Sequence, residues 1–136
     1  MLRRLYLMKG CPFRIIIPKV IFTNDFVPDS KVADYFCASD IVVQPYKDAT
    51  QSGVTQIAYH FEKPMLVTDV GGLAEIVPKE VGYVVKSDIT EIADSIIDFY
   101  ENSKEVDFVK GAQKEKLKYS WEKMLETIDE LVKSLG

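Results

Sequence analysis

Two short turns hold the residues whose types could bind an anion. Ser52-Gly53 and Gly71-Gly72 each precede a helix-like pattern, and a strand-like run lies between them. A helix N-terminus has free backbone N–H groups and a partial positive charge, so it binds phosphate where the backbone can be approached closely. Gly53 permits that approach, and the Ser52 hydroxyl can donate a hydrogen bond. One interpretation of the sequence is therefore a phosphate site at Ser52-Gly53, with Gly71-Gly72 as its second wall.

Two further polar residues, Thr50 and Gln51, precede the first turn and add to its hydrogen-bonding capacity. The competing interpretation is purely structural, because Gly and Ser are common wherever a strand is followed by a helix. The stretch matches neither the Walker phosphate loop nor the G-x-G-x-x-G dinucleotide fingerprint. Local sequence alone leaves both interpretations open.

Spacing argues against other catalytic or metal-binding arrangements. His60 is the only histidine, and it follows Ser52 on the same predicted helix at about 12 Å, too far for a Ser-His-Asp triad. Cys11 and Cys37 have no C-x-x-C spacing and no paired histidines, so neither a zinc site nor a disulfide framework is expected. Cys37 falls on the apolar side of a helix pattern and is expected to be a buried thiol.

Bulk properties narrow the class of protein. The chain of 136 residues is long enough for one domain with one core, and 47% hydrophobic and 28% charged residues are typical of soluble globular proteins. A net charge of −4 excludes a general nucleic-acid binder. The apolar start is broken by Lys9, Gly10, Pro12 and Arg14, and no run has the length of a membrane span. We therefore expect a cytoplasmic protein without a signal peptide.

Strand and helix patterns alternate along the chain. Strands are predicted over residues 14–25 (divided by Pro18), 40–45, 64–69 and 81–85, and helices over residues 28–36, 52–62, 71–77, 89–102, 106–119 and 121–135. This alternation predicts an α/β fold, a Rossmann-like parallel sheet with helices on both faces. Ligands bind such sheets at the carboxyl ends of the strands, so both glycine-containing turns should open on one edge.

In this order the motifs resemble the carboxyl-terminal half of a GT-B glycosyltransferase of the group 1 (family 4) type. The likeness covers residues 20–123. It rests on "VIFTNDFVPDSKVADYFCASDIVVQPY", on "SGVTQIAYHFEKPMLVTDVGGLAEIVP", on "VGYVV" followed by "ITEIADSIIDFY", and on the Ser-Trp helix "YSWEKMLETIDELV". The T-D-V-G-G-x-x-E-I-V segment is fairly specific, and the ordered set is more so.

The resemblance implies a role for each turn. In that family this half binds a nucleotide-sugar donor. The turn Ser52-Gly53-Val54 would hold the diphosphate through backbone N–H groups, and Val70-Gly71-Gly72 would shape the same cleft. Phe26 and Val27 would lie near the nucleobase, and Gln56 would face the ribose.

The sequence departs from the family at two acidic positions. The family usually has two glutamates flanking the phosphate turn, one contacting the sugar and one the ribose. An ungapped alignment, which we prefer, puts Ala49 and Ile57 at those positions. A shift by one residue would put Asp48 and Gln56 there instead, which keeps the spacing and part of the polarity.

The implied function is that of the donor-binding part of an enzyme. Its reaction would be retaining transfer of a sugar from a UDP-, GDP- or similar sugar nucleotide to a glycan or lipid-linked acceptor, with no metal and no cofactor. Residues 20–136 would form this domain, and residues 1–19 an atypical segment. The amino-terminal acceptor domain is absent, so we expect the chain alone to be inactive, with membrane contact only through that half.

Two alternatives remain. The chain could be a non-catalytic Rossmann-like interaction module, or an inactive remnant, that needs a protein partner to supply the acceptor domain. It could also be a different nucleotide-binding Rossmann-like protein, although this would not account for the T-D-V-G-G order.

Overall fold

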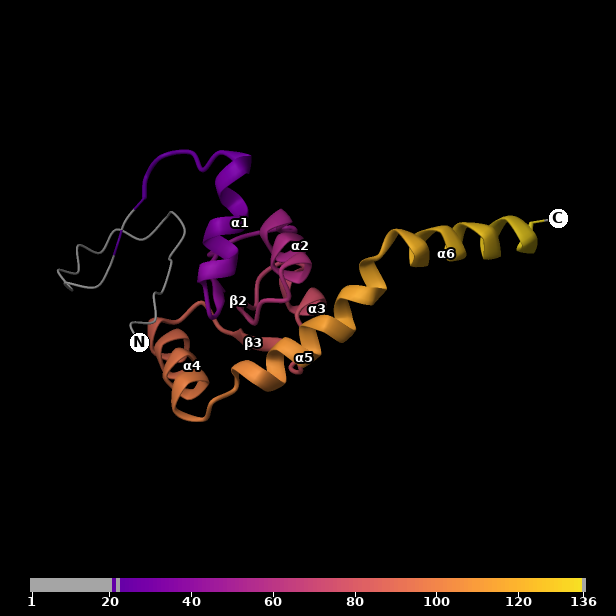
Figure 1. The fold of residues 1–136 in the computed structure, drawn as a ribbon. Coiled ribbons are helices and arrows are strands. Elements are labelled where there is room, and N and C mark those ends of the chain that lie inside the picture. The colour runs from indigo at the N-terminus through magenta and orange to yellow at the C-terminus, as the bar shows by residue number, and fades with distance from the viewer. Residues whose placement is uncertain (1–20, 22, 136) are drawn as a thin grey trace.

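The computed structural model describes residue 21 and residues 23–135 (Figure 1). The segment 1–19 and most of the strand predicted over 14–25 lie outside the described residues. Within them, the elements are α1 (Asp29–Ala38), β1 (Val42–Gln44), α2 (Gly53–His60), β2 (Met65–Thr68), α3 (Leu73–Ile76), β3 (Gly82–Val85), α4 (Ile89–Glu101), α5 (Glu105–Lys116), the 3-10 turn η1 (Leu117–Tyr119) and α6 (Trp121–Ser134). The predicted order of these elements is confirmed.

The three described strands form a parallel sheet in the order β1-β2-β3. Val43 pairs with Leu66, and Leu66 pairs with Tyr83. Every residue of β1 and β2 is buried. This explains why both strands are apolar up to their last residues, Gln44 and Thr68, and do not alternate between apolar and polar residues.

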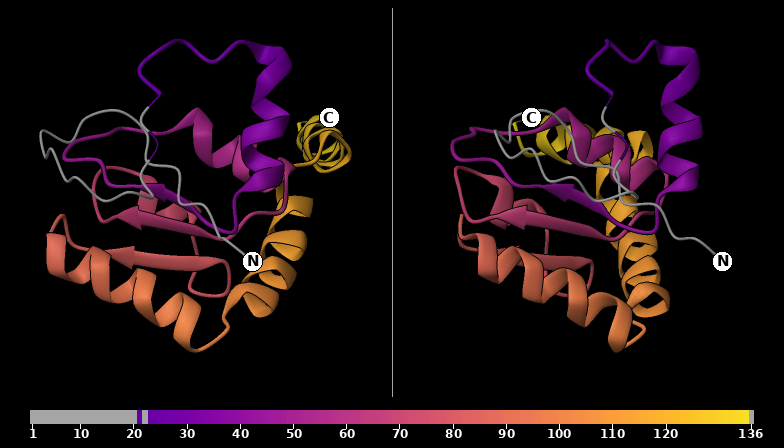
Figure 2. Two further views of the ribbon diagram at one scale, coloured as in Figure 1. Left: turned by 60° about the vertical axis from the view of Figure 1, so that its left-hand side comes forward. Right: turned by 90° about the vertical axis from the view of Figure 1, so that its left-hand side faces the viewer.

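Helices cover both faces of the sheet, as predicted (Figure 2). Met65 and Val67 point to one face, where they pack with Tyr59 of α2 and with residues of α3. Leu66 lies between them in sequence and points to the other face, where Phe99 of α4 covers it. Helix α5 contributes to both cores, with Ala112 on the first and Phe108 on the second.

The carboxyl end of α2 is held by polar contacts as well as by the core. The Tyr59 hydroxyl donates to the carbonyl of Ile76, and burial raises the pKa of that hydroxyl, which keeps it a neutral donor. Glu62 has a φ of 56°, and its carboxylate accepts from Gln113 Nε2 at 2.9 Å and from Lys116 Nζ at 3.1 Å. These two hydrogen bonds lower the pKa of Glu62.

Helix α1 follows Pro28, its N-cap residue, whose extended backbone places Asp29 in the first turn. One detail of α1 differs from the predictions. Cys37 was predicted to be buried, but it is exposed. The reason is that α1 buries none of its residues completely, and it packs on the core mainly through Phe36.

Helix α6 begins where the sequence indicated, with Ser120 Oγ accepting from the amide of Lys123 at 3.2 Å. None of its residues is buried, and Figure 1 shows it extending away from the sheet. The apolar residues along one side of α6 therefore remain exposed in the described part of this chain. They are Trp121, Met124, Leu125, Ile128, Leu131, Val132 and Leu135. None of the described helices combines the length and apolarity that crossing a membrane requires.

The core of the sheet predicts a contrast between two leucines. Leu66→Ala should lower the free energy of unfolding by about 2–5 kcal/mol, because Leu66 is fully buried and the truncation leaves a cavity. Leu125→Ala on α6 should change it by less than about 0.5 kcal/mol, since that side chain is 57% exposed. Urea denaturation followed by circular dichroism measures both, and equal effects would contradict this description of the core.

Candidate functional site

Both neighbouring strands leave the sheet through the same kind of tight turn. The amide of Tyr46 donates to the carbonyl of Gln44 at 2.9 Å after β1, and the amide of Val70 donates to the carbonyl of Thr68 at 2.8 Å after β2. Because β1 and β2 are parallel and paired, the two loops that follow emerge at the same edge of the sheet. This prediction is confirmed.

The two loops contact each other through their backbones. The amide of Gly72 donates to the carbonyl of Thr50 at 2.9 Å. Gly71 has a φ of +54°, and a Cβ placed on it would lie 1.6 Å from the carbonyl oxygen of Ala49. Only glycine fits there, because both the backbone conformation and the space exclude a side chain. The Gly71-Gly72 turn thus forms a wall beside the loop that leads into α2.

The N-terminus of α2 is open to an approaching ligand. Ser52 is the N-cap residue in extended conformation, and its side chain makes no capping hydrogen bond. Asp88 and Ser120, in contrast, accept hydrogen bonds from amides in the first turns of α4 and α6. The amides of Gly53 and Val54 thus have no side-chain cap. A Cβ built on Gly53 meets no atom within 4 Å, so the backbone can be approached closely at this point.

The remaining predicted polar residues lie in different surroundings. Asp48, Thr50 and Gln51 are exposed in the loop before α2. Gln56 is exposed on α2 and lies in a separate shallow groove beside Lys123 and other residues at the start of α6. The structure therefore does not bring Gln56 together with Phe26 and Val27. Among residue 21 and residues 23–135, no group of three or more His, Cys, Asp or Glu is placed to hold a metal ion.

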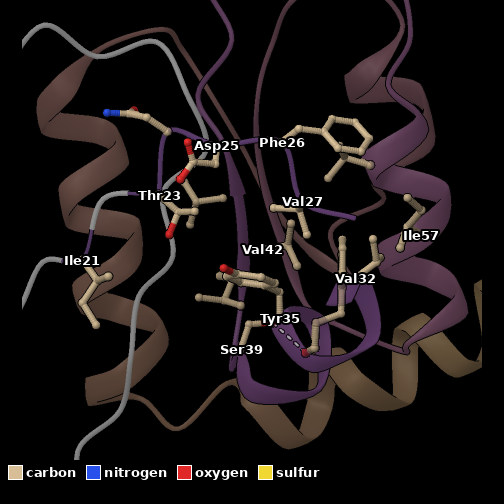
Figure 3. Close-up of a pocket in the computed structure, with 15 residues that line it drawn as sticks. Ile21, Thr23, Asp25, Phe26, Val27, Val32, Tyr35, Ser39, Val42 and Ile57 are labelled. Carbon is tan, nitrogen blue, oxygen red and sulfur yellow. Dashed lines mark hydrogen bonds between the residues drawn. The ribbon is translucent and has the colours of Figure 1, made fainter. Parts of the chain in front are cut away.

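An apolar cavity of about 490 Å³ adjoins the N-terminal half of α2 (Figure 3). Phe26 and Val27, predicted near a nucleobase, line it together with Val54 and Ile57 of α2. Helix α1 and the edge of β1 complete the lining, which also includes Ile21, Thr23, Asn24, Asp25, Val32, Tyr35, Phe36, Ser39, Ile41, Val42 and Val43. The structure thus brings the predicted base loop close to the predicted phosphate turn.

One polar residue of the site was not singled out from the sequence. Thr68, the last residue of β2, is fully buried, and its hydroxyl donates to the carbonyl of Tyr46 at 2.6 Å. A hydroxyl at the end of an otherwise apolar buried strand was the available signal. Gln44 ends β1 in the same way: its Oε1 accepts from Thr55 at 3.4 Å, and its buried Nε2 has no hydrogen-bond partner within the described chain.

The sheet, its covering helices and the joined turns define an α/β domain of the Rossmann-like class. The family model of glycosyl transferases group 1 matches residues 10–102, which is more than half of the chain. The chain therefore belongs to this family, and the resemblance seen in the sequence is confirmed.

A solved structure agrees with this assignment. Sucrose-phosphate synthase from Thermosynechococcus elongatus matches 87% of this chain with a TM-score of 0.71 and 21% sequence identity. At that identity the likeness shows the fold alone, which is that of a GT-B glycosyltransferase. The chain spans 30% of the length of that structure. A search of curated proteins finds no match.

The joined turns predict opposite behaviour for two glycines. Gly71→Ala should lower the free energy of unfolding by more than about 1 kcal/mol, since alanine is strained at this φ and its methyl group meets the Ala49 carbonyl. Gly53→Ala should leave it within about 0.5 kcal/mol, because the space is open and alanine suits a helix. Thermal and urea denaturation test the pair, and an unaffected Gly71→Ala protein would refute the described contact.

Proposed function

We propose that this chain is the part of a retaining glycosyltransferase that binds the nucleotide-sugar donor. The parent reaction is transfer of the sugar to a glycan or lipid-linked acceptor. The observation that carries this proposal is the backbone contact between the Gly71-Gly72 turn and the loop before α2, beside an α2 N-terminus without a side-chain cap. Membership of the group 1 family supports it.

The diphosphate of the donor occupies the N-terminus of α2. The amides of Gly53 and Val54 donate to phosphate oxygens, and the Ser52 hydroxyl adds a third donor. When the sugar–phosphate bond breaks, its electron pair stays on the diphosphate oxygen, whose negative charge increases. Donors that are already in place, together with the helix dipole, stabilise that charge without a metal ion.

The nucleoside lies in the mouth of the apolar cavity. A volume of about 490 Å³ falls within the roughly 300–1,000 Å³ of common ligand pockets. Phe26, with 87% of its surface exposed, and Val27 are free to cover a planar base. Ile57 cannot hydrogen-bond a ribose hydroxyl, so ribose recognition depends on backbone groups or on Asp48, which is exposed in the neighbouring loop.

Sugar transfer also needs a domain that positions the acceptor on the opposite side of the cleft. The described residues offer one side of a cleft, and the catalytic advantage of holding two reactants together requires both sides. We therefore propose that the chain binds its donor but does not transfer sugar without a domain for the acceptor.

A second candidate function is that of an interaction module, and helix α6 favours it. Its exposed apolar residues take about three of every seven positions. This fraction is typical of a helix that packs against a broad surface, whereas a helix of a two-stranded coiled coil has about two of seven. They are Trp121, Met124, Leu125, Ile128, Leu131, Val132 and Leu135. Exposed patches of this kind mark protein interfaces. The partner would supply the acceptor domain.

Donor binding is tested by nuclear magnetic resonance titration of the isotope-labelled chain with UDP, GDP and their sugar conjugates. Saturable shifts should centre on Ser52, Gly53 and Val54, and Gly53→Ala should weaken the affinity about tenfold or more, because its methyl group occupies the space of the phosphate. Ile89→Ala, at the first position of α4, is the matched control and should bind normally. A well-dispersed spectrum without shifts at millimolar nucleotide would rule the proposal out.

Without that partner, the exposed apolar residues of α6 on two copies of the chain should cover one another, so sedimentation velocity over a range of protein concentrations tests the surface. The apparent mass should rise with concentration, and the double substitution Leu125→Glu and Ile128→Glu should hold the protein at monomer mass. Thr127→Glu with Ser134→Glu adds the same charge to α6 outside these apolar residues and should not do so. A monomer at every concentration, or equal behaviour of the two double variants, would argue against this surface.

A further inference from the structure

We infer that the buried hydroxyl of Thr68 is a positioning group for the phosphate turn. It holds residues 45–52, here called the β1–α2 loop, in the conformation in which the amides of Gly53 and Val54 face a bound phosphate. Its effect on ligand affinity rests on the proposed function, whereas its effect on the loop does not.

Three contacts from the end of β2 and the turn after it reach the β1–α2 loop. The Thr68 hydroxyl donates to the carbonyl of Tyr46 at 2.6 Å, Gly71 lies against the carbonyl of Ala49, and the amide of Gly72 donates to the carbonyl of Thr50 at 2.9 Å. Each contact ends on a backbone carbonyl of the loop. The path of the loop therefore depends on these contacts from its neighbour as well as on the packing of Tyr46 and Ala49 against the core.

Among these three contacts, only the hydrogen bond from Thr68 comes from a fully buried residue. Thr68 is 0% exposed, whereas Gly71 is exposed and Gly72 is half-buried. Removing the hydroxyl would leave the carbonyl of Tyr46 without this donor in a partly buried place, where an unmet hydrogen bond favours rearrangement. The loop would then be free to shift at its first residues.

The start of α2 is held less firmly than its second half, because Val54 packs on the core while only partly buried. Ala58 and Tyr59 anchor the second half of the helix in the core, while Gly53 at its beginning is exposed. Thr55 is buried in the first turn, but its hydroxyl reaches Gln44 Oε1 only at 3.4 Å, a long hydrogen bond. Amides that bind phosphate must be correctly placed, and a displacement of about 1 Å can cost as much as a hundredfold in function.

The test compares Thr68→Val, which keeps the shape but removes the hydroxyl, with Thr68→Ser, which keeps the hydroxyl. Thr55→Val is the matched control, because Thr55 is equally buried and its hydroxyl bonds a side chain instead of the loop backbone. Amide shifts and hydrogen exchange of residues 46–54 are measured first in the free protein. Affinity for UDP and GDP is then measured by titration.

Thr68→Val should shift these amides and speed their exchange, leave those of α4 unchanged and weaken nucleotide binding about tenfold. Thr68→Ser should resemble the parent protein, and Thr55→Val should alter these amides less than Thr68→Val does, because its hydroxyl contacts a side chain through a long hydrogen bond. If Thr68→Val does not fold, Thr68→Cys, with its weak donor, replaces it and should show the same changes to a lesser degree. The inference is overturned if the loop responds no more to Thr68→Val than to the control.

Failure of the donor proposal gives a different result. If the parent protein binds neither nucleotide while Thr68→Val still alters the loop amides, Thr68 positions the loop and the proposed ligand is wrong. If the parent protein binds and Thr68→Val binds equally well, the positioning role is wrong and the donor proposal stands.

Discussion

The hydrogen bond from the amide of Gly72 to the carbonyl of Thr50 is the contact on which the candidate site depends. It joins two separate loops. The loops can approach this closely because Gly71, with a φ of +54°, has no side chain to meet the Ala49 carbonyl. The parallel pairing of β1 and β2 brings the loops to one edge, and this contact then sets their separation. As a result, the Gly71-Gly72 turn lies directly beside the loop that leads into α2.

The residues that hold the sheet together are separate from those that are exposed beyond the ends of its strands. The side chains of β1 and β2 are buried and alternate between two cores, so the sheet forms a rigid base. Thr50, Gln51 and Gly53 lie just beyond the ends of these strands and are exposed. This arrangement lets the loop residues vary without disturbing the core, which is why sites are common on loops above such scaffolds.

Membership of the glycosyl transferases group 1 family and the exposed face of α6 are consistent with one physical account. Under the proposed function, the loops at the carboxyl ends of the described strands would bind a sugar nucleotide, but the described residues enclose no complete reaction space. An amphipathic helix such as α6, none of whose residues is buried within the described part of the chain, gains free energy by packing against another surface. A partner domain for the acceptor would satisfy both requirements at once.

The sequence by itself determined the elements, their order and the edge of the sheet where the site lies, because hydrophobic periodicity and paired glycines are local signals. It did not determine which side chains meet there. Cys37 was expected inside and is exposed, Gln56 lies apart from the base loop while Ile57 lines its cavity, and the contact from Thr68 to Tyr46 was not foreseen. Each of these depends on how a helix is rotated on the sheet or how one loop crosses another. Such relations arise from packing between distant segments, and only the tertiary structure decides them.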